Sequence, residues 1–272
     1  MSYDYQLLTV AITDGVATVT INHPPINLFD LPLMDEIGRV GEELAADDAV
    51  RVIVFQSADP DFFIAHADVE LIQTLPSDNP ARPEEISFFH KMLELYRNMP
   101  KVSIGKVEGI ARGGGSEFLL ALDMRFAAVG RAVLSQPEVA IGIIPGGGGC
   151  VRLPRLIGRG RALEVILGCE DFDAVTAERY GYVNRALEPD ALGPFVDGLA
   201  RRIASFPAHA IARAKAAVNN GDALPVEAAL LEEEHCFNLT LGEPDTRELM
   251  ATFMANGGQT REVEIQGIPL PS

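Results

Sequence analysis

Apolar and polar residues follow a strand pattern and then a helix pattern in the N-terminal part of the chain. Residues 5–13 are rich in β-branched side chains, and residues 16–21 alternate apolar and polar positions, with the turn pair Asp14-Gly15 between them. Residues 32–46 then begin with a proline and repeat apolar side chains every three or four positions. This order predicts two strands joined by a hairpin turn, followed by a helix.

The alternation of strand and helix continues through the middle of the chain. Short apolar runs at residues 52–55, 102–107 and 124–128 predict buried strands, and the amphipathic residues 83–99 predict a helix between the first two of these strands. Residues 76–83 are rich in Pro, Ser and Asn and predict a mobile surface loop. Strands that alternate with helices indicate an α/β fold.

The C-terminal part of the chain has a different pattern. Residues 190–256 predict several helices and no strand, with the clearest helical spacing at residues 208–218 and 227–239. The Gly and Pro residues after position 256 predict an irregular tail. We therefore expect an α/β core over residues 1–200 and a helical C-terminal region with its tail over residues 201–272.

Charge and composition exclude several classes of protein. The chain of 272 residues carries 22 Lys and Arg against 39 Asp and Glu, a net charge of −17, whereas nucleic-acid binders and polybasic membrane anchors need positive surfaces. The first residues lack the basic start and apolar run typical of a signal peptide, and the sequence has no apolar run of about 18 residues. The three cysteines form no Cys-x-x-Cys pair, which disfavours a zinc site. We expect a cytoplasmic protein without a metal, nucleic-acid or membrane partner.

A glycine-rich segment at residues 109–117 (GIARGGGSE) follows a predicted strand and precedes an apolar run. Glycines at such a junction expose backbone N–H groups to a ligand, and the helix dipole adds positive potential. No Gly-Lys-Ser/Thr follows, so a phosphate loop is excluded, and the first strand of the chain does not lead into the segment as in a dinucleotide site. An oxyanion hole remains, or glycine used only for close packing.

Two glutamates lie near glycine-rich segments. Glu117 ends the first segment, where a carboxylate is often only a partner of the helix dipole. Glu138 lies among apolar residues, so its carboxyl group is paired, shifted in pKa or placed at the mouth of a cleft. A second glycine-rich loop follows at residues 142–149. Two carboxylates and an oxyanion-type loop favour proton transfer next to a carbonyl group.

These motifs resemble those of the crotonase superfamily, the enoyl-CoA hydratase/isomerase family. The resemblance is carried by residues 109–128 (GIARGGGSEFLLALDMRFAA) and 134–149 (LSQPEVAIGIIPGGGG). It implies an α/β fold, a crotonase-like spiral of ββα units, with a C-terminal helical oligomerisation region. The implied assembly is a homotrimer or a dimer of trimers. The implied substrate is an acyl-CoA, with coenzyme A as part of the substrate and no separate cofactor.

The resemblance also implies an oxyanion hole of two backbone N–H groups for the thioester enolate. Gly114 is expected to supply one of these groups and Ala65 the other. The expected substrate and coenzyme A contacts are Ala65, His66, Ala67, Asp68, Gly114, Ile26 and Leu28.

In hydratases of this family two glutamates hold the attacking water, and Glu117 and Glu138 match both positions. The implied reaction adds water across the C2=C3 bond of a trans-2-enoyl-CoA thioester. Glu138 is expected to protonate C2 and Glu117 to activate water, although the sequence leaves the opposite assignment open. The alternatives are an enoyl-CoA isomerase or other acyl-CoA enolate chemistry, and a catalytically silent binding protein of the same fold.

Three features depart from the family pattern or leave a choice open. His66 stands at a usual glycine position, and its side chain is expected either to point away from the ligand or to contact it. The residues after Phe253 lack the basic segment that helps to hold coenzyme A. The basic cluster Arg152, Arg155, Arg159 and Arg161 is expected to contact coenzyme A phosphates or to balance acids at a subunit interface.

Overall fold

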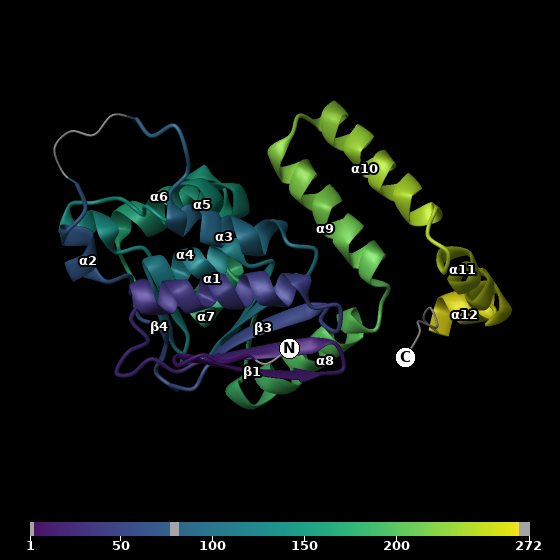
Figure 1. Ribbon diagram of the computed structural model, residues 1–272, viewed down its shortest axis with the longest axis horizontal. Coiled ribbons are helices and arrows are strands. Elements are labelled where there is room, and N and C mark those ends of the chain that lie inside the picture. Colours follow the sequence, from purple (N-terminus) through teal and green to yellow (C-terminus); the bar gives the residue numbers. More distant parts are fainter. Residues whose placement is uncertain (1–2, 77–81, 267–272) are drawn as a thin grey trace.

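The strands of the protein form two sheets in a computed structural model that describes residues 3–76 and 82–266 (Figure 1). The larger sheet has the order β1 (Leu8–Thr13), β2 (Val16–Ile21), β3 (Val52–Ser57), β5 (Val102–Val107), β7 (Met124–Ala128), β10 (Arg185–Leu187). β1 and β2 form an antiparallel hairpin, and the later neighbours are parallel. The smaller sheet has the order β4 (Phe62–Ile64), β6 (Ile110–Arg112), β8 (Val133–Ser135), β9 (Phe172–Asp173).

Three successive segments take the same path through both sheets. Each segment enters the larger sheet, crosses to the smaller sheet and returns through helices, and the strand pairs are β3–β4, β5–β6 and β7–β8. The helices that follow these pairs are α2 (Val69–Gln73) and α3 (Phe88–Asn98), then α4 (Gly114–Ala121), then η1 (Glu138–Ile141), α5 (Gly149–Ile157) and α6 (Arg159–Gly168). The predicted α/β spiral of ββα units is confirmed.

Helices cover both faces of the larger sheet. α1 (Leu31–Ala46), α3 and α4 pack on one face and share one hydrophobic core with it. α8 (Pro189–Ala204) packs on the other face, because Leu192, Val196, Ala200 and Ala204 recur every four residues and are all buried there. α7 (Ala174–Tyr180) leads from the smaller sheet to the last strand.

The predicted strands are present, although the first begins at Leu8 and not at residue 5, and one predicted helix starts later than expected. α3 begins at Phe88 and not at residue 83, because the Ser87 hydroxyl accepts the His90 N–H at 3.2 Å and so caps the helix. Of the predicted loop at residues 76–83, residues 77–81 lie outside the described part of the chain.

The C-terminal region is helical as predicted. α9 (Ala208–Ala223) and α10 (Val226–Leu241) form an antiparallel hairpin beside the core, followed by α11 (Thr246–Ala255) and α12 (Arg261–Gln266). α12 occupies positions where an irregular tail was expected, and residues 267–272 lie outside the described chain. α8 runs through residue 200, and the division of the chain at that residue stays a prediction. Within the described residues, no helix has the length and apolar character needed to span a bilayer.

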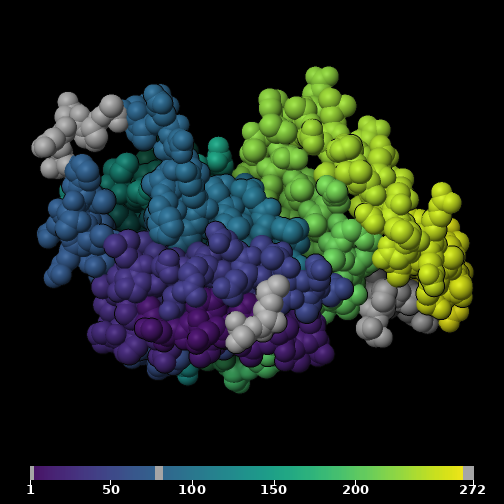
Figure 2. All heavy atoms as spheres, in the orientation of Figure 1, coloured from purple at the N-terminus to yellow at the C-terminus, as the bar shows by residue number. Residues whose placement is uncertain are grey.

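Polar contacts attach α9 to the core. The Lys215 ammonium donates to the carbonyl oxygens of Tyr96 and Lys101 and to the Asp123 carboxylate, each at 2.8 Å. Arg97 pairs with Asp222 at 2.5 Å. A groove of about 1440 Å³ lies between this helix and the core, where Figure 2 shows the surface hollowed beside the α9–α10 hairpin.

Candidate active site

The predicted site residues come from three consecutive turns of the spiral. Residues 65–68 follow β4, Gly114 and Glu117 open α4 just after β6, and Glu138 follows β8 closely. β4, β6 and β8 are parallel neighbours, so their carboxyl ends lie at one edge of the smaller sheet. The structure therefore brings the predicted residues together from distant parts of the sequence.

Aromatic packing fixes α4, which carries Gly114 and Glu117. Phe118 is fully buried, and its ring contacts the rings of Phe29, Phe55, Phe63 and Tyr96, with centroid distances from 5.0 to 6.5 Å. The contact with Phe63 is stacked and the other three are edge-to-face, and both geometries favour a defined side-chain position. The residue that follows Glu117 thus anchors the helix start in the core.

The second glycine-rich loop holds the Glu117 carboxylate. One carboxylate oxygen, Oε1, accepts the N–H groups of Gly147 and Gly149 at 2.7 and 2.8 Å. Burial raises the pKa of Glu117, while these two hydrogen bonds and the charge of Arg152 act in the opposite direction. The loop therefore stabilises the ionised form of a carboxyl group that is almost fully buried.

Arg152 supports this loop from α5. Its guanidinium group donates to the Gly147 carbonyl oxygen at 3.3 Å and pairs with Glu94. Arg152 is buried, so of the two roles expected for the basic cluster, a contact with coenzyme A phosphates does not apply to this residue. Arg161 lies over the Tyr180 ring at 5.0 Å from its centroid.

Glu138 is also buried, with 8% of its surface exposed. Burial raises its pKa to about 7; a hydrogen bond to its own backbone opposes this shift and the charge of Glu117 adds to it. The two carboxyl groups thus have different surroundings, since Glu117 accepts two loop N–H groups, whereas Glu138 is buried close to the negative charge of Glu117.

The structure contradicts the prediction that Ala65 is an oxyanion donor. Its N–H already donates to the Ile26 carbonyl oxygen at 3.2 Å, and the residue is 3% exposed. A backbone N–H group that is bonded within the protein and shielded from the cleft has no hydrogen left to offer to a ligand. The prediction that Ala65 supplies the oxyanion N–H is therefore wrong.

Ala67 and Gly114 supply the free pair of N–H groups instead. Phe29 pairs with the residues on either side of Ala67, accepting from Asp68 N–H at 3.1 Å and donating to the His66 carbonyl at 2.9 Å. Across residues 3–76 and 82–266, the Ala67 N–H has no acceptor. Gly114 is the first residue of α4, so its N–H has no helical acceptor, and a Cβ added to it would lie 3.3 Å from the Ala67 nitrogen.

The remaining predicted contacts lie around this pair. The His66 ring nitrogen Nδ1 hydrogen-bonds the Ala67 carbonyl oxygen at 2.8 Å, so the ring is tied to the backbone of the oxyanion segment. The Asp68 carboxylate caps α2 by accepting the Glu70 N–H at 2.9 Å. Ile26 and Leu28 are half-buried in the loop that pairs with residues 65–68.

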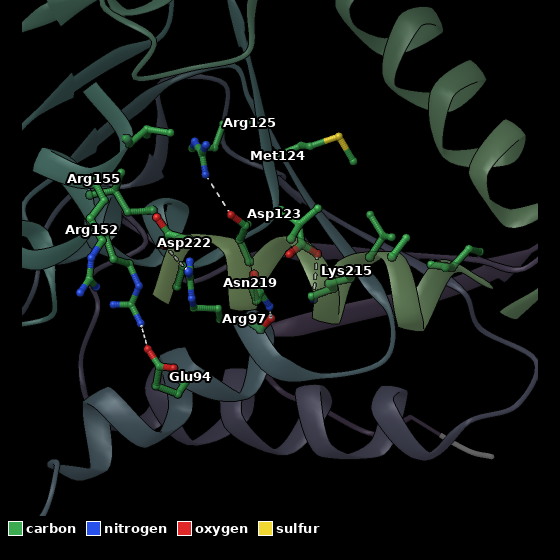
Figure 3. A pocket seen from close by; sticks show the side chains of 18 of the residues that line it. Glu94, Arg97, Asp123, Met124, Arg125, Arg152, Arg155, Lys215, Asn219 and Asp222 are labelled. Atoms are coloured by element: carbon green, nitrogen blue, oxygen red, sulfur yellow. Dashed lines mark hydrogen bonds and ion pairs between the residues drawn. The ribbon is translucent and has the colours of Figure 1, made fainter. Parts of the chain in front are cut away.

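The groove beside α9 is separate from the two glutamates. Figure 3 shows its charged lining, in which Arg97 pairs with Asp222, Arg152 with Glu94 and Lys215 with Asp123. Neither Glu117 nor Glu138 lines this groove, although Gly148 and Arg152 reach it from the back of the loop that holds Glu117.

Sequence reasoning missed two parts of the site. It noted the glycine-rich loop 142–149 but did not predict that its N–H groups hold Glu117, and it did not single out Arg152 as the support of that loop. The only sequence signal for this arrangement is the run of four glycines ending just before Cys150, which keeps side chains away from the buried carboxylate.

Comparisons with known proteins agree with this geometry. The model of a family described as enoyl-CoA hydratase/isomerase matches residues 11–259. The crotonyl-CoA hydratase of Syntrophomonas wolfei is 34% identical over 92% of this chain and 95% of its own, and the short-chain-enoyl-CoA hydratase of Clostridium acetobutylicum is 31% identical over 88% and 91%. The crystal structure of an enoyl-CoA hydratase from Bacillus anthracis superposes with a TM-score of 0.84 at 29% identity, covering 93% of this chain and 97% of that one.

Proposed function

The chain belongs to the enoyl-CoA hydratase/isomerase family, and from this premise we propose that it is a hydro-lyase that adds water across the C2=C3 bond of a trans-2-enoyl-CoA thioester. The observation that carries the proposal is the pair of buried glutamates with unequal surroundings beside two free backbone N–H groups. Hydration of a conjugated thioester needs a base for water, an acid for carbon and a site for the carbonyl charge.

The two acids divide the proton transfers. Glu117 takes the proton from the attacking water, because the N–H groups of Gly147 and Gly149 favour its ionised form. Glu138 gives its proton to C2, because burial and the neighbouring Glu117 charge favour its protonated form. The water proton ends on Glu117, the water oxygen bonds to C3, and the proton of Glu138 bonds to C2.

The Ala67 and Gly114 N–H groups bind the thioester oxygen. Negative charge moves onto this oxygen when water attacks C3, and fixed donors stabilise it without any reorganisation of solvent. Loss of one such donor typically costs about 3 kcal/mol in the transition state. The backbone N–H groups polarise the thioester carbonyl, so the chain itself supplies the electrophilic assistance that the reaction needs. We infer that coenzyme A enters only as part of the substrate.

We further propose that the coenzyme A part of the substrate lies along residues 26–28 and 65–68. We also propose that the chain forms a homotrimer or a dimer of trimers. Exposed apolar side chains on the C-terminal hairpin support the assembly: Val218, Val226, Leu230, Leu231 and Phe237. A cytoplasmic location stays a prediction.

The test is the ultraviolet absorbance of crotonyl-CoA, which falls when water saturates the conjugated thioester. We expect the wild-type protein to remove the absorbance and Glu117→Gln and Glu138→Gln each to slow this by about 10²- to 10⁴-fold, the usual contribution of one acid or base. Acyl-CoA binding, followed by the rise in thermal stability, should be retained in both variants.

Two results would contradict the proposal. A wild-type protein that acyl-CoA stabilises but that leaves crotonyl-CoA unchanged would point to other enolate chemistry in the same site. A protein that acyl-CoA does not stabilise would be a silent member of the fold. Either result separates the hydratase from the alternatives.

A further inference from the structure

Arg152 is a buried cation behind the loop that holds Glu117. Only 9% of its surface is exposed, and a Cβ added to Gly148 would lie 2.2 Å from its Nη1. Nη1 donates to the Gly147 carbonyl oxygen at 3.3 Å, and Nη2 pairs with Glu94. The buried Nε has no hydrogen-bond partner among the described residues. The guanidinium group therefore fills the space beneath the loop and leaves one of its donors unsatisfied.

The two peptide groups of Gly147 join the carboxylate to the guanidinium group. The Gly147 N–H donates to Glu117 Oε1 at 2.7 Å, and the Gly147 carbonyl oxygen accepts from Arg152. The backbone N–H of Arg152 also donates to the Gly148 carbonyl oxygen at 2.7 Å. Arg152 thus fixes the peptide group next to the one that binds Glu117.

Two carboxylates act on the charge of Arg152. Glu94 of α3 contacts the guanidinium group directly, and Figure 3 shows the two side chains pointing toward each other. The charges of Glu94 and Glu117 both raise the pKa of Arg152 against the effect of burial, and the charge of Arg152 lowers the pKa of Glu117. Glu94 is partly exposed to water, whereas Glu117 is 3% exposed. Of the two carboxylates, Glu117 therefore depends more on a nearby cation.

We propose that Arg152 is a positioning residue for Glu117, which holds the Gly147 peptide group against the carboxylate and supplies the positive charge that keeps this carboxylate ionised, while Glu94 fixes the guanidinium group. The inference rests on the proposed function, in which Glu117 is the base for water. Two N–H groups satisfy the hydrogen bonds of a buried carboxylate but leave its charge uncompensated. Arg152 acts through the loop and has no contact with the reacting atoms.

Other titratable groups lie on the elements around α4. They are Glu138 of η1, Cys150 of α5, Glu94, Tyr96 and Arg97 of α3, Arg112 of β6, and Tyr182. The two other cations of this set each have an acidic partner at 2.5 Å. The acids and hydroxyl groups bring no positive charge. Arg152 is therefore the cation of the described structure whose charge favours ionised Glu117.

Two substitutions separate the charge of Arg152 from its length. Arg152→Met removes the charge at similar length, so the pKa of Glu117 should rise by about one unit, the usual effect of losing one opposite charge at close range. Arg152→Lys keeps the charge but lacks the planar fork, and it should restore most of that shift. Arg155→Met is the matched control, because Arg155 is exposed on the same helix and water screens its charge. The control should leave the pKa of Glu117 unchanged.

A further variant separates this electrostatic role from simple packing of α3 against α5. Glu94→Gln keeps an oxygen that can accept from the guanidinium group and removes the negative charge that offsets it. The pKa of Glu117 should therefore stay where it is or fall. A loosened contact between the two helices would instead raise it, as in Arg152→Met.

The measurement is difference infrared spectroscopy of the whole chain across pH. It follows the C=O stretch of the protonated carboxyl group, with Glu117→Gln identifying the band. The kinetics of crotonyl-CoA hydration give a second readout. A base must be ionised to act, so the acidic limb of kcat/KM should move to higher pH in Arg152→Met.

A rise in the pKa of Glu117 in Arg152→Met, largely restored in Arg152→Lys and absent in Glu94→Gln, supports the role of Arg152. An unchanged pKa in Arg152→Met, an equal rise in Arg152→Lys or an equal rise in Glu94→Gln would overturn it. If Arg152→Met does not fold, Arg152→Gln replaces it, because this side chain is neutral and keeps a donor for the Gly147 carbonyl oxygen. The infrared titration needs no turnover, so a protein that leaves crotonyl-CoA unchanged contradicts the proposed function and still tests Arg152.

Discussion

Glu117 and Glu138 carry the same functional group, and the backbone around them makes them different. Glu117 places one oxygen against two N–H groups, whereas burial and the neighbouring negative charge favour a proton on Glu138. A pair of carboxyl groups can act as base and acid together only when their environments separate their pKa values. The glycine-rich loop that ends before Cys150 provides that separation.

The first prediction at this scale concerns pH. As pH rises through about 7, Glu138 loses the proton that it gives to C2 in the proposed reaction, so kcat/KM for crotonyl-CoA hydration should fall on the alkaline side. Steady-state kinetics over a pH series measures this limb. In Glu138→Gln the residual activity should lack the limb, and a limb that persists in that variant would assign it to another group.

A second prediction concerns Gly147. A Cβ at this position would lie 2.2 Å from Phe89 Cε1 and 2.6 Å from Glu117 Oε2, so Gly147→Ala must displace the carboxylate. We expect kcat to fall by about 100-fold, the usual cost of misplacing a reacting group by about 1 Å. The neighbouring Gly146→Ala is the control, because its nearest atom, the Ile144 carbonyl oxygen, is 3.8 Å away. Equal activity of both variants would disprove this role of the loop.

The sequence predicted which glutamates meet but not which N–H group is free. Glu117, Glu138 and Gly114 lie together as the resemblance implied. Ala65 failed as a donor because the loop at Ile26 takes its N–H, and that pairing joins segments far apart in the chain. A contact between residues 39 positions apart leaves no mark on the local pattern of side chains.

At the scale of elements, α9 is held to the core by polar groups. Lys215 is largely buried and donates to two carbonyl oxygens and to Asp123, while the Asn219 amide donates to the Arg97 carbonyl oxygen at 2.8 Å. Burial lowers the pKa of Lys215, and the charge of Asp123 opposes this shift. One buried ammonium group therefore ties the helix to two backbone carbonyl oxygens and a carboxylate of the core.

A third prediction follows for this helix. Lys215→Met removes the ammonium donor of two carbonyl oxygens and of the Asp123 carboxylate, which keeps only its hydrogen bonds from Ser103, so α9 should open locally at a cost of about 3 kcal/mol. Hydrogen exchange should show faster amide exchange in α9 with unchanged exchange in β3 and β5. Lys91→Met is the control, because Lys91 is exposed and pairs with an exposed Glu85. Slow exchange of α9 in the Lys215 variant would show that apolar contacts suffice.

Long elements were predictable and short ones were not. β1, β2, β3, β5, β7 and the helices α9 and α10 have enough residues for their periodicity to show, whereas β10 has three residues and was not predicted. β4, β6, β8 and β9 have two or three residues each, and a pattern of alternation needs more positions than that. The whole smaller sheet, whose edge carries the site, was therefore implied by the resemblance alone.

At the scale of the whole molecule, the C-terminal hairpin presents apolar side chains to solvent. On α10, Leu230 is 57% exposed and Phe237 is 58% exposed; they lie on one stripe of the helix at a spacing of seven residues, with the exposed Glu233 and Glu234 between them. Exposed apolar side chains that gather on the surface of a single chain often mark a contact with another chain. The hairpin projects beside the core, where a second copy can reach it.

The fourth prediction tests that contact. Leu230→Glu combined with Phe237→Glu places two charges in the stripe, so the assembly should dissociate to single chains while the core stays folded. Sedimentation velocity measures the mass of the particle. Asn238→Glu adds a charge to an exposed position of the same helix beside the stripe and should leave the assembly intact. A wild-type protein that sediments as a single chain would refute the proposed trimer.

The order of strands in both sheets is also the order in which the chain is made. β1, β2, β3, β5, β7 and β10 are neighbours in sequence order across one sheet, and β4, β6, β8 and β9 across the other. Each stretch that leaves the ribosome can therefore add to an edge that already exists. Glu117 receives its backbone partners from glycines 30 and 32 positions later, so a nascent chain stopped before Gly147 contains Glu117 without the loop that favours its ionised form. The candidate active site is therefore completed late in the synthesis of the chain.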